Sequence, residues 1–386
     1  MADSFTEKSS KSYGKRIGES FKGIASGGLL FLVGIGLLVF NEKNSVEVSK
    51  SLKEGENCVI SVSSETVDPA NDQKLVHFTG RAVAESLLAD EEFGVAVTNE
   101  LRLIRSVEMY QWTEEVREET EEKIGGREET TRTYTYKKTW SPDLIDSSSF
   151  AHPEGHDNPA DFLFGEKEVL ADEVFVGAFR IPPNQARYIG SPIDLPAELH
   201  PAAGLPTNIV KTAHGWYLPG ARNGTAQDPQ IGDERVVFRH VPPCDVSFIA
   251  QQIGSTIAAY PTKTKALFIH ENGIHSSAEM FSNQRKANSM LTWLLRLLGF
   301  ILISGGVKMI LAPLVVLASV LPFLGRIVGF GTGFVAFLVG LIVSLLTIAI
   351  SWLAYRPLIG IPLLVAVVAL IVFLVRKVKA AKIADA

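Results

Sequence analysis

"LLFLVGIGLLVFNEKN", residues Leu29 to Asn44, is an apolar run near the N-terminus that stops at an asparagine and a glutamate. The apolar part extends from about residue 23 to Phe40. It is longer than the roughly 7–15 apolar residues of a secretory signal peptide, and no small-residue cleavage site follows it. The sequence therefore predicts an uncleaved transmembrane helix over residues 23–40, with a cleaved signal peptide as the alternative.

The C-terminal quarter of the chain is a second apolar region. No Asp or Glu occurs between Glu279 and Asp385, and the mean hydropathy of the whole chain is +0.18. Runs of about 20 apolar residues match the roughly 30 Å hydrocarbon core of a bilayer. They predict three more membrane spans, at about 291–311, 328–355 and 357–375. The stretch 312–325 contains two prolines and is too short for a span, so we expect a cytoplasmic interfacial or re-entrant segment there.

Basic residues flank the predicted spans and give their orientation. By the positive-inside rule, residues 1–22 and 376–386 are cytoplasmic tails, and residues 41–290 form an extracytoplasmic or lumenal domain. The predicted location is a bacterial inner membrane, or the endoplasmic reticulum or inner nuclear membrane in a eukaryote. The exterior domain is acidic, which argues against nucleic acid as a partner. The basic inner face suits anionic lipid.

The fold class predicted is α+β: a multi-pass α-helical membrane protein of four spans with a large β-rich exterior domain. Short alternating runs such as "DVSFIAQQI" are broken by Gly, Pro and Asn, as is typical of strands. "VEMYQW" and "TYTYKKTW" bracket a charged insertion with Gly125-Gly126, which predicts a β-hairpin with a long solvated arm. Its aromatic residues favour sheet packing, with an exposed platform for a partner as the alternative: Tyr110, Trp112, Tyr134, Tyr136 and Trp140.

Candidate chemical sites are few. His152 and His156 are four residues apart with Asp157 beside them, but Pro153 and Gly155 argue against a helical metal site. A turn with solvated side chains is therefore favoured over a loop metal site.

The cysteines and the basic residues near the spans each have two possible interpretations. Cys58 and Cys244 are the only cysteines and form either one disulfide or two buried thiols. Basic residues near the spans are topological anchors or contacts to lipid head groups: Arg296, Lys308 and Arg326. The sequence predicts no cofactor.

Several of these segments together resemble the transmembrane protein 43 family, also called LUMA. They are "LLVFNEKNSVEVSKSLKEG", "VEMYQW", "TYTYKKTWSPDLIDSSSF", "GHDNP", "IGDERVVF" and "TWLLRLLGFILISGG". The resemblance implies four spans, a large domain in the lumen or its bacterial equivalent, and self-association. Animal members organise membrane protein complexes with emerin and lamins, and the family supplies no catalytic residues to carry over. The sequence does not show whether its source has a nucleus, so lamin partners are not implied.

Three functional hypotheses follow. The first is a non-enzymatic membrane scaffold that self-associates and organises other membrane proteins. The second is lipid or small-molecule binding or transfer by the exterior domain or the helices. The third, less favoured, is a membrane-tethered hydrolase that uses His152, His156 and Asp157. The expected partners are membrane lipids, other membrane proteins and further copies of the chain.

Overall fold

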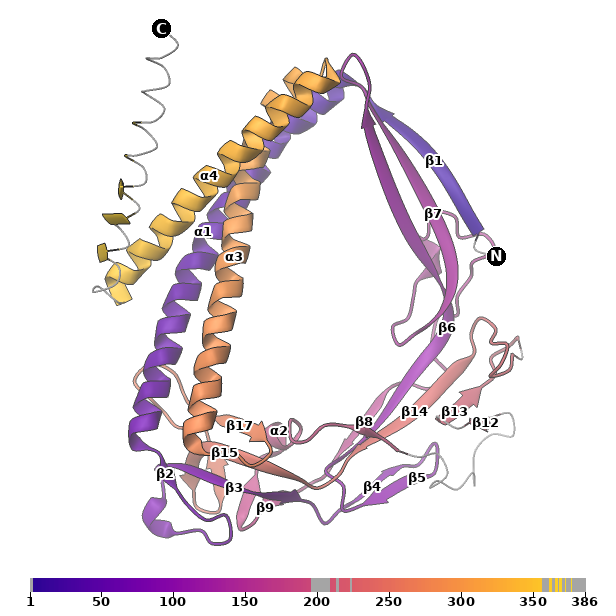
Figure 1. The fold of residues 1–386 in the computed structure, drawn as a ribbon. Helices are drawn as coiled ribbons and strands as arrows, with labels where there is room; N and C mark the ends of the chain where they lie inside the picture. Colours follow the sequence, from indigo (N-terminus) through magenta and orange to yellow (C-terminus); the bar gives the residue numbers. More distant parts are fainter. Residues whose placement is uncertain are drawn as a thin grey trace. The chain divides into compact units, whose positions relative to one another are not determined.

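The computed structural model describes residues 3–195, 209–212, 215–222 and 224–355, together with single residues between 361 and 376. The chain divides into two compact units (Figure 1). The first, called the β-rich unit, comprises Met1–Thr6, Lys53–Arg117 and Thr133–Phe281. The second, called the helical unit, comprises Glu7–Leu52, Glu118–Arg132 and Ser282–Ala386. The prediction of a large β-rich domain joined to long apolar helices is confirmed.

A seven-stranded sheet forms one part of the β-rich unit. Its strands are β2 (Ile60–Ser61), β3 (Leu75–Val83), β9 (Val174–Val176), β10 (Phe179–Ile181), β15 (Cys244–Ile253), β16 (Thr256–Ala258) and β17 (Ile269–Asn272). The pairings β3–β9, β9–β10, β10–β16, β16–β15 and β15–β3 close into a ring. Phe78 stacks on Phe179 and Phe248 with ring centroids 4.3 and 5.5 Å apart, and all three rings are buried. Aromatic packing therefore fills this part of the core.

The second sheet has eight strands, in the order β1-β7-β6-β14-β13-β12, with β8 on β6 and β11 on β14. Their bounds are β1 (Asp3–Lys11), β6 (Arg102–Glu122), β7 (Glu128–Ser141), β8 (Lys167–Leu170), β11 (Ile193–Asp194), β12 (Val210–Thr212), β13 (Gly215–Leu218) and β14 (Glu234–Val241). Smaller elements are β4 (Leu87–Asp90), β5 (Val95–Thr98), α2 (Pro183–Ala186) and two 3-10 turns, Pro69–Asn71 and Ser147–Ser149. Phe93, Trp216 and Phe238 pack together in the core of this unit.

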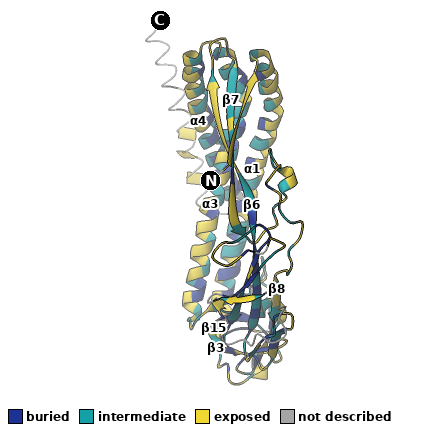
Figure 2. Ribbon diagram, turned by 90° about the vertical axis from the view of Figure 1, so that its right-hand side faces the viewer, coloured by how far each residue is buried: buried dark blue, intermediate teal, exposed yellow. Residues whose placement is uncertain are grey.

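Strands β6 and β7 form the predicted hairpin, whose outer part, residues 113–138, we call the arm. Side chains of β6 alternate between intermediate and buried up to Gln111, and residues 115–121 are all exposed (Figure 2). The turn uses Gly125 and Gly126 at φ 88° and 74°, a left-handed conformation that glycine adopts without strain. The prediction of a hairpin with a solvated arm is confirmed. Its end, residues 118–132, is called the arm tip.

Three helices are long and apolar enough to cross a membrane among the described residues: α1 (Tyr13–Cys58), α3 (Ser277–Ala318) and α4 (Pro322–Tyr355). The first is about 69 Å long at 1.5 Å per residue. It extends past the predicted span 23–40 because residues 41–54 contain neither glycine nor proline. Residues 41–58 and 277–290, which the prediction had included in the β-rich domain 41–290, are therefore helical. The predicted span 357–375 lies almost entirely outside the described residues.

The segment 312–325 is mostly helical. Helix α3 continues through Pro313 to Ala318, and α4 begins at Pro322. Proline suits the first helical position, where its missing N–H leaves no broken hydrogen bond. The segment is therefore the end of one helix, a short turn at 319–321 and the start of the next. Its cytoplasmic, interfacial or re-entrant position stays a prediction.

The N-terminal residues, predicted as a cytoplasmic tail, contain regular structure. Residues 3–11 form β1, which neighbours β7 in the sheet, and α1 begins two residues later. Arg16 of α1 lies 2.5 Å from Glu122 of the arm tip. The structure therefore brings the segment 1–22 together with part of the segment 41–290. The sequence had placed these two segments on opposite sides of a membrane.

Glycines bring α1 and α3 close together. A Cβ atom added to Gly27 would lie 2.7 Å from the carbonyl oxygen of Gly306, and one added to Gly34 would lie 3.0 Å from that of Gly299. Small residues at such contacts allow the backbones of apolar helices to approach closely. On α4, Gly340 meets Ser304 of α3 in the same way.

Candidate functional site

A buried ion pair joins three helices of the helical unit. Glu42 of α1 is 1% exposed, and its carboxylate accepts hydrogen bonds from Nε and Nη2 of Arg296 on α3, at 2.6 and 2.9 Å. Trp352 of α4 donates its Nε1–H to the same carboxylate at 2.6 Å. The guanidinium lies 4.8 Å from the ring of Trp293 and 5.4 Å from that of Trp352. We call these four residues the Glu42 cluster.

Polar contacts extend the cluster along α1 and α3. Asn41 donates to the carbonyl oxygen of Thr292 at 3.0 Å, and Asn288 donates to that of Ser45 at 3.1 Å. The hydroxyl of Thr292 donates to that of Ser45 at 2.9 Å. These groups fix the register of the two helices, because each would be left unsatisfied if the helices slid past each other.

The Glu42 cluster changes the interpretation of Arg296. The sequence had offered this residue as a topological anchor or a lipid contact. Its side chain is 14% exposed and is bound to Glu42 in a bidentate arrangement, which is the strong geometry for an arginine and a carboxylate. Lys308 and Arg326 are exposed. They remain predicted contacts for lipid head groups.

A second buried arginine lies at the arm tip. Arg16 is 9% exposed and contacts Glu122 at 2.5 Å and Glu128 at 3.3 Å. It also donates to the carbonyl oxygen of Gly126 at 2.8 Å and to the hydroxyl of Ser319 at 3.1 Å. This one guanidinium therefore connects the start of α1, the arm tip and the turn between α3 and α4.

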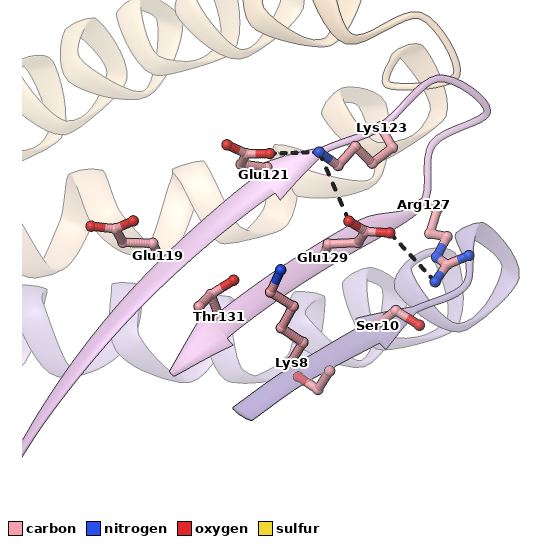
Figure 3. A pocket seen from close by; sticks show the side chains of 9 residues that line it. Lys8, Ser10, Glu119, Glu121, Lys123, Arg127, Glu129 and Thr131 are labelled. Carbon is pink, nitrogen blue, oxygen red and sulfur yellow. Dashed lines mark hydrogen bonds and ion pairs between the residues drawn. The ribbon is translucent and has the colours of Figure 1, made fainter. Parts of the chain in front are cut away.

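A groove of about 430 Å³ lies on the arm tip, between side chains of β1, β6 and β7 (Figure 3). Its charges pair with one another. Lys123 lies 2.6 Å from Glu121 and 3.8 Å from Glu129, which is 3.4 Å from Arg127. The hydrogen bond that Lys123 donates to Glu121 raises the pKa of Lys123. The groove therefore presents no surplus of one sign that would select a charged ligand.

In the β-rich unit, buried carboxylates bind neighbouring groups of the chain. Asp233 accepts from the hydroxyl of Tyr217 and from the backbone N–H of Gly220 and Gln230, the latter two at 2.6 Å. Glu234 accepts from the N–H groups of Leu163 and Phe164, and burial raises its pKa. These contacts hold loops onto strand β14, which is a structural role.

A third buried carboxylate of the β-rich unit pairs with a buried arginine. Asp90 lies 3.0 Å from Arg105, which also contacts Glu92 and the carbonyl oxygen of Gly165. The ring of Phe93 lies 5.3 Å from the guanidinium. This cluster ties the β4–β5 hairpin to β6.

The histidines of the predicted loop do not assemble a metal or catalytic centre. His156 is 2% exposed, stacks on Tyr136 at 3.9 Å, and its Nδ1 lies 3.0 Å from the carbonyl oxygen of His152. Asp157 is exposed. No group of three or more His, Cys, Asp or Glu residues close enough to hold a metal occurs within the described residues. The hydrolase hypothesis therefore lacks the converging side chains that it requires.

The predicted aromatic residues are packed and do not form an exposed platform. Tyr134 and Tyr136 are buried, and the other three are partly buried. Tyr136 donates to Glu114 at 2.5 Å, and burial raises its pKa to about 12. Tyr110 contacts Trp140 with ring centroids 5.2 Å apart. These contacts support the interpretation as sheet packing.

Both cysteines are free thiols in the structure, and the disulfide stays an untested prediction. Their surroundings differ: Cys58 is exposed at the end of α1 and interacts with Tyr260, whereas Cys244 lies at the start of β15 beside Gly190. Burial raises the pKa of the Cys244 thiol.

Sequence reasoning missed Glu42 and Asp233 as central residues. A signal existed for Glu42, because it follows the apolar run directly and a charge at such a boundary has a partner in most helical membrane proteins. Asp233 lies within "IGDERVVF", where two consecutive acids precede an alternating strand. No local pattern identifies their partners, which lie on other elements.

Comparison with known proteins agrees with this architecture. The profile of the family described as Transmembrane protein 43 matches residues 109–357. The Homo sapiens protein "Transmembrane protein 43" is 31% identical over 379 residues, covering 95% of this chain and 92% of its own length. The Drosophila melanogaster "Transmembrane protein 43 homolog" is 27% identical over 353 residues, covering 88% and 90%. No solved structure matches the chain. The chain therefore belongs to the transmembrane protein 43 family.

Proposed function

We propose that this protein is a non-enzymatic membrane scaffold. Its helices associate with further copies of the chain and with other membrane proteins, and its β-rich unit lies outside the cytoplasm. The observation that carries the proposal is a face of α4 around Gly329 and Gly333 on which nothing packs closely among the described residues.

The face on α4 combines glycines with exposed aromatic side chains. Gly329 and Gly333 are four residues apart, the spacing at which small residues let two apolar helices approach. Gly325, one turn earlier, is already packed against Ser319. A Cβ atom at Gly333 would meet nothing within 4 Å, and one at Gly329 would meet only Val315, at 3.5 Å. Phe330 between them is 80% exposed. Among the described residues, nothing packs closely on Gly333, so this face is open to a helix of a second copy.

The buried carboxylates support a non-enzymatic role. The described part of the chain buries four: Glu42, Asp90, Asp233 and Glu234. Each of them binds an arginine, a tryptophan, a tyrosine or backbone N–H groups of its own chain. A catalytic acid or base has to reach a substrate in a cleft. These four carboxylates instead hold helices, strands and loops of the chain together, as a rigid scaffold requires.

Cysteine cross-linking tests the association. Gly333→Cys in a Cys58→Ser, Cys244→Ser background should form a disulfide-linked dimer in native membranes under mild oxidation. Gly36→Cys on α1 is the matched control, since a Cβ there also meets nothing within 4 Å, and it should remain monomeric. Chemical cross-linking of the unaltered chain in the same membranes should yield multimers and a reproducible set of membrane proteins.

Two results would contradict the proposal. Monomer only from both cysteine variants, with no partner cross-linked to the unaltered chain, would remove the basis for a scaffold. A purified protein that retains one lipid species in stoichiometric amount, and no protein partner, would favour the lipid-binding hypothesis instead.

A further inference from the structure

The exposed apolar side chains of α1 end abruptly at Phe40. Large hydrophobic residues are exposed at intervals from Phe21 to Phe40, and the latter is 64% exposed. None is exposed from residue 41 to Cys58, a stretch that the structure describes in full. From Phe21 to Phe40 the helix rises by about 29 Å, close to the roughly 30 Å thickness of the hydrocarbon core. The exposed apolar surface of α1 therefore has the length of one span and ends at Phe40.

Helix α3 shows the same change at its own start. Between Ser277 and Ser289, all of them described residues, no large hydrophobic side chain is exposed, and Arg285 and Lys286 are among the exposed residues. Exposure of large apolar side chains begins at Met290, which is 65% exposed, and continues along the helix. The surface of α3 thus changes from polar to apolar at residues 289–290.

The changes on α1 and α3 occur at nearly the same level. Asn41 donates to the carbonyl oxygen of Thr292, and Asn288 donates to that of Ser45, so the two helices are antiparallel. In this register the end of the apolar surface on α1 and its beginning on α3 are offset by about three residues, which is roughly 4.5 Å along a helix. Two segments far apart in the sequence therefore agree on one boundary.

The Glu42 cluster lies at this boundary. Its member Trp293 is 66% exposed, and Trp352 brings α4 to the same level through its hydrogen bond to Glu42. Tryptophan is enriched where membrane proteins pass from acyl chains to head groups. A charged pair such as Glu42 and Arg296 also costs less free energy there than at the centre of a bilayer.

We propose that the Glu42 cluster marks the surface of a phospholipid bilayer. Acyl chains contact the helices on the side of Phe40 and Leu294. On the other side, residues 41–52 of α1 and 282–289 of α3 form a two-helix stalk in water. Because the stalk exposes polar side chains, it offers a surface to soluble protein segments and none to lipid.

Fluorescence quenching at four positions tests this inference. Single cysteines are placed in the Cys58→Ser, Cys244→Ser background of the full chain: Phe40→Cys, Leu294→Cys, Lys50→Cys and Lys286→Cys. All four side chains are exposed, so their replacement removes little packing. Each variant is labelled with an environment-sensitive fluorophore and reconstituted into phosphatidylcholine nanodiscs, whose two faces are both open to the buffer.

The labels at positions 40 and 294 should be quenched several times more strongly by nitroxides near the head-group end of the acyl chains than by aqueous iodide. Positions 50 and 286, on the same two helices, are the matched controls, and iodide should be the stronger quencher there. The reversal should occur on both helices, because the boundary is common to them.

Three results would overturn the proposal. Quenching by nitroxide lipid at positions 50 and 286 would place the membrane surface farther along the helices and leave no stalk. Stronger quenching by iodide at positions 40 and 294 would place the Glu42 cluster in water, away from the bilayer. Shielding of these two positions from both quenchers would mean that protein, such as a second copy, covers the helices where lipid is proposed.

Discussion

Glu42 and Arg296 lie 254 residues apart in the sequence and form a bidentate ion pair between α1 and α3. Glu42 is the acid that ends the first apolar run, and Arg296 is a rare charge in the acid-free C-terminal region. Both are largely withdrawn from solvent, and Trp352 adds α4 to the contact. The pair therefore ties the first membrane-type helix to two later ones at a defined register.

Removing one partner of this pair should destabilise the helical unit strongly. Glu42→Ala leaves the Arg296 guanidinium buried without its counter-ion, which costs about 3–5 kcal/mol in comparable buried pairs. Thermal unfolding in detergent, followed by tryptophan fluorescence, should show a clear decrease in midpoint temperature. The double variant Glu42→Leu, Arg296→Met should be more stable than Glu42→Ala, because no charge then remains unpaired.

Lys43→Ala is the control for this experiment. Lys43 lies 3.8 Å from Glu47 on the exposed side of the same helix, and such surface pairs contribute about 0.5 kcal/mol or less. Its midpoint should stay close to that of the unaltered chain. If Lys43→Ala and Glu42→Ala lower the midpoint temperature equally, the ion pair of Glu42 and Arg296 contributes no more to stability than a surface pair does.

Two adjacent glycines on α1 should respond differently to a bulky side chain. Gly27→Leu introduces atoms where the carbonyl oxygen of Gly306 lies 2.7 Å from the new Cβ position, so α1 and α3 have to separate. Overpacking of this kind costs about 1–3 kcal/mol. Gly28→Leu meets nothing within 4 Å and should be nearly neutral. Thermal unfolding of the two variants measures the difference, and equal stabilities would contradict the α1–α3 packing.

The sequence predicted those elements whose signal is local. Apolar length predicted the helices, and alternating aromatics around Gly125-Gly126 predicted the hairpin. The extent of α1 to Cys58 was not evident, because nothing in residues 41–58 requires a helix and their composition only permits one.

Contacts between distant elements could not be predicted in this way. The nine residues of β1 are all exposed and lack an alternating pattern, so only the edge of β7 makes them a strand. The Glu42 cluster depends on the register of α1 against α3 and α4, and the sequence alone does not give that register. For the same reason, the sequence offered Arg296 only as a topological anchor or a contact to lipid head groups, and not as the partner of Glu42.

Stability of the β-rich unit should depend on the ionisation of Glu234. Burial raises its folded-state pKa above the value in the unfolded chain. The folded state then binds more protons over the interval between the two values, so stability falls as pH rises through it. Unfolding measured from acidic to neutral pH should therefore show a decline that Glu234→Gln lacks, since the amide oxygen still accepts from the backbone but does not ionise.

Glu92→Gln provides a control, because the contribution of Glu92 to stability should change with pH in the direction opposite to that of Glu234. The hydrogen bond from Arg105 lowers the pKa of Glu92, so its contribution is present above the unfolded-state value and is lost as pH falls through the lowered folded value. The difference between the unaltered chain and Glu92→Gln should thus increase with pH. Slopes of the same sign in the two variants would refute the assignment for Glu234.

The two cysteines should react at different rates. Cys58 is exposed, whereas Cys244 is partly buried and has a raised pKa, which lowers its thiolate fraction at neutral pH. Mass spectrometry of the non-reduced protein treated with a maleimide should show fast addition of one label and slow addition of a second. Cys58→Ser should abolish the fast phase. A protein that takes up no label until it is reduced would instead contain a disulfide.

The contact between Arg16 and the arm tip should survive a reversal of charges. Arg16→Glu places a carboxylate against Glu122 and Glu128, and repulsion between these groups should release the turn from Val320. Hydrogen exchange in reconstituted vesicles should show faster exchange at the N–H of Gly125. Adding Glu122→Arg and Glu128→Arg to the variant should restore slow exchange.

The solvent-exposed ion pair of Lys11 and Glu19, in the same N-terminal segment as Arg16, provides the control for Arg16→Glu. Lys11 and Glu19 lie 3.0 Å apart with 45% of each side chain exposed, so Lys11→Glu should leave exchange at Gly125 unchanged. The outcome also bears on topology, because Arg16 precedes the first apolar run and Glu122 belongs to the predicted exterior domain. If Arg16→Glu leaves exchange at Gly125 unchanged in vesicles, the two segments are apart in the membrane, as the positive-inside rule had placed them.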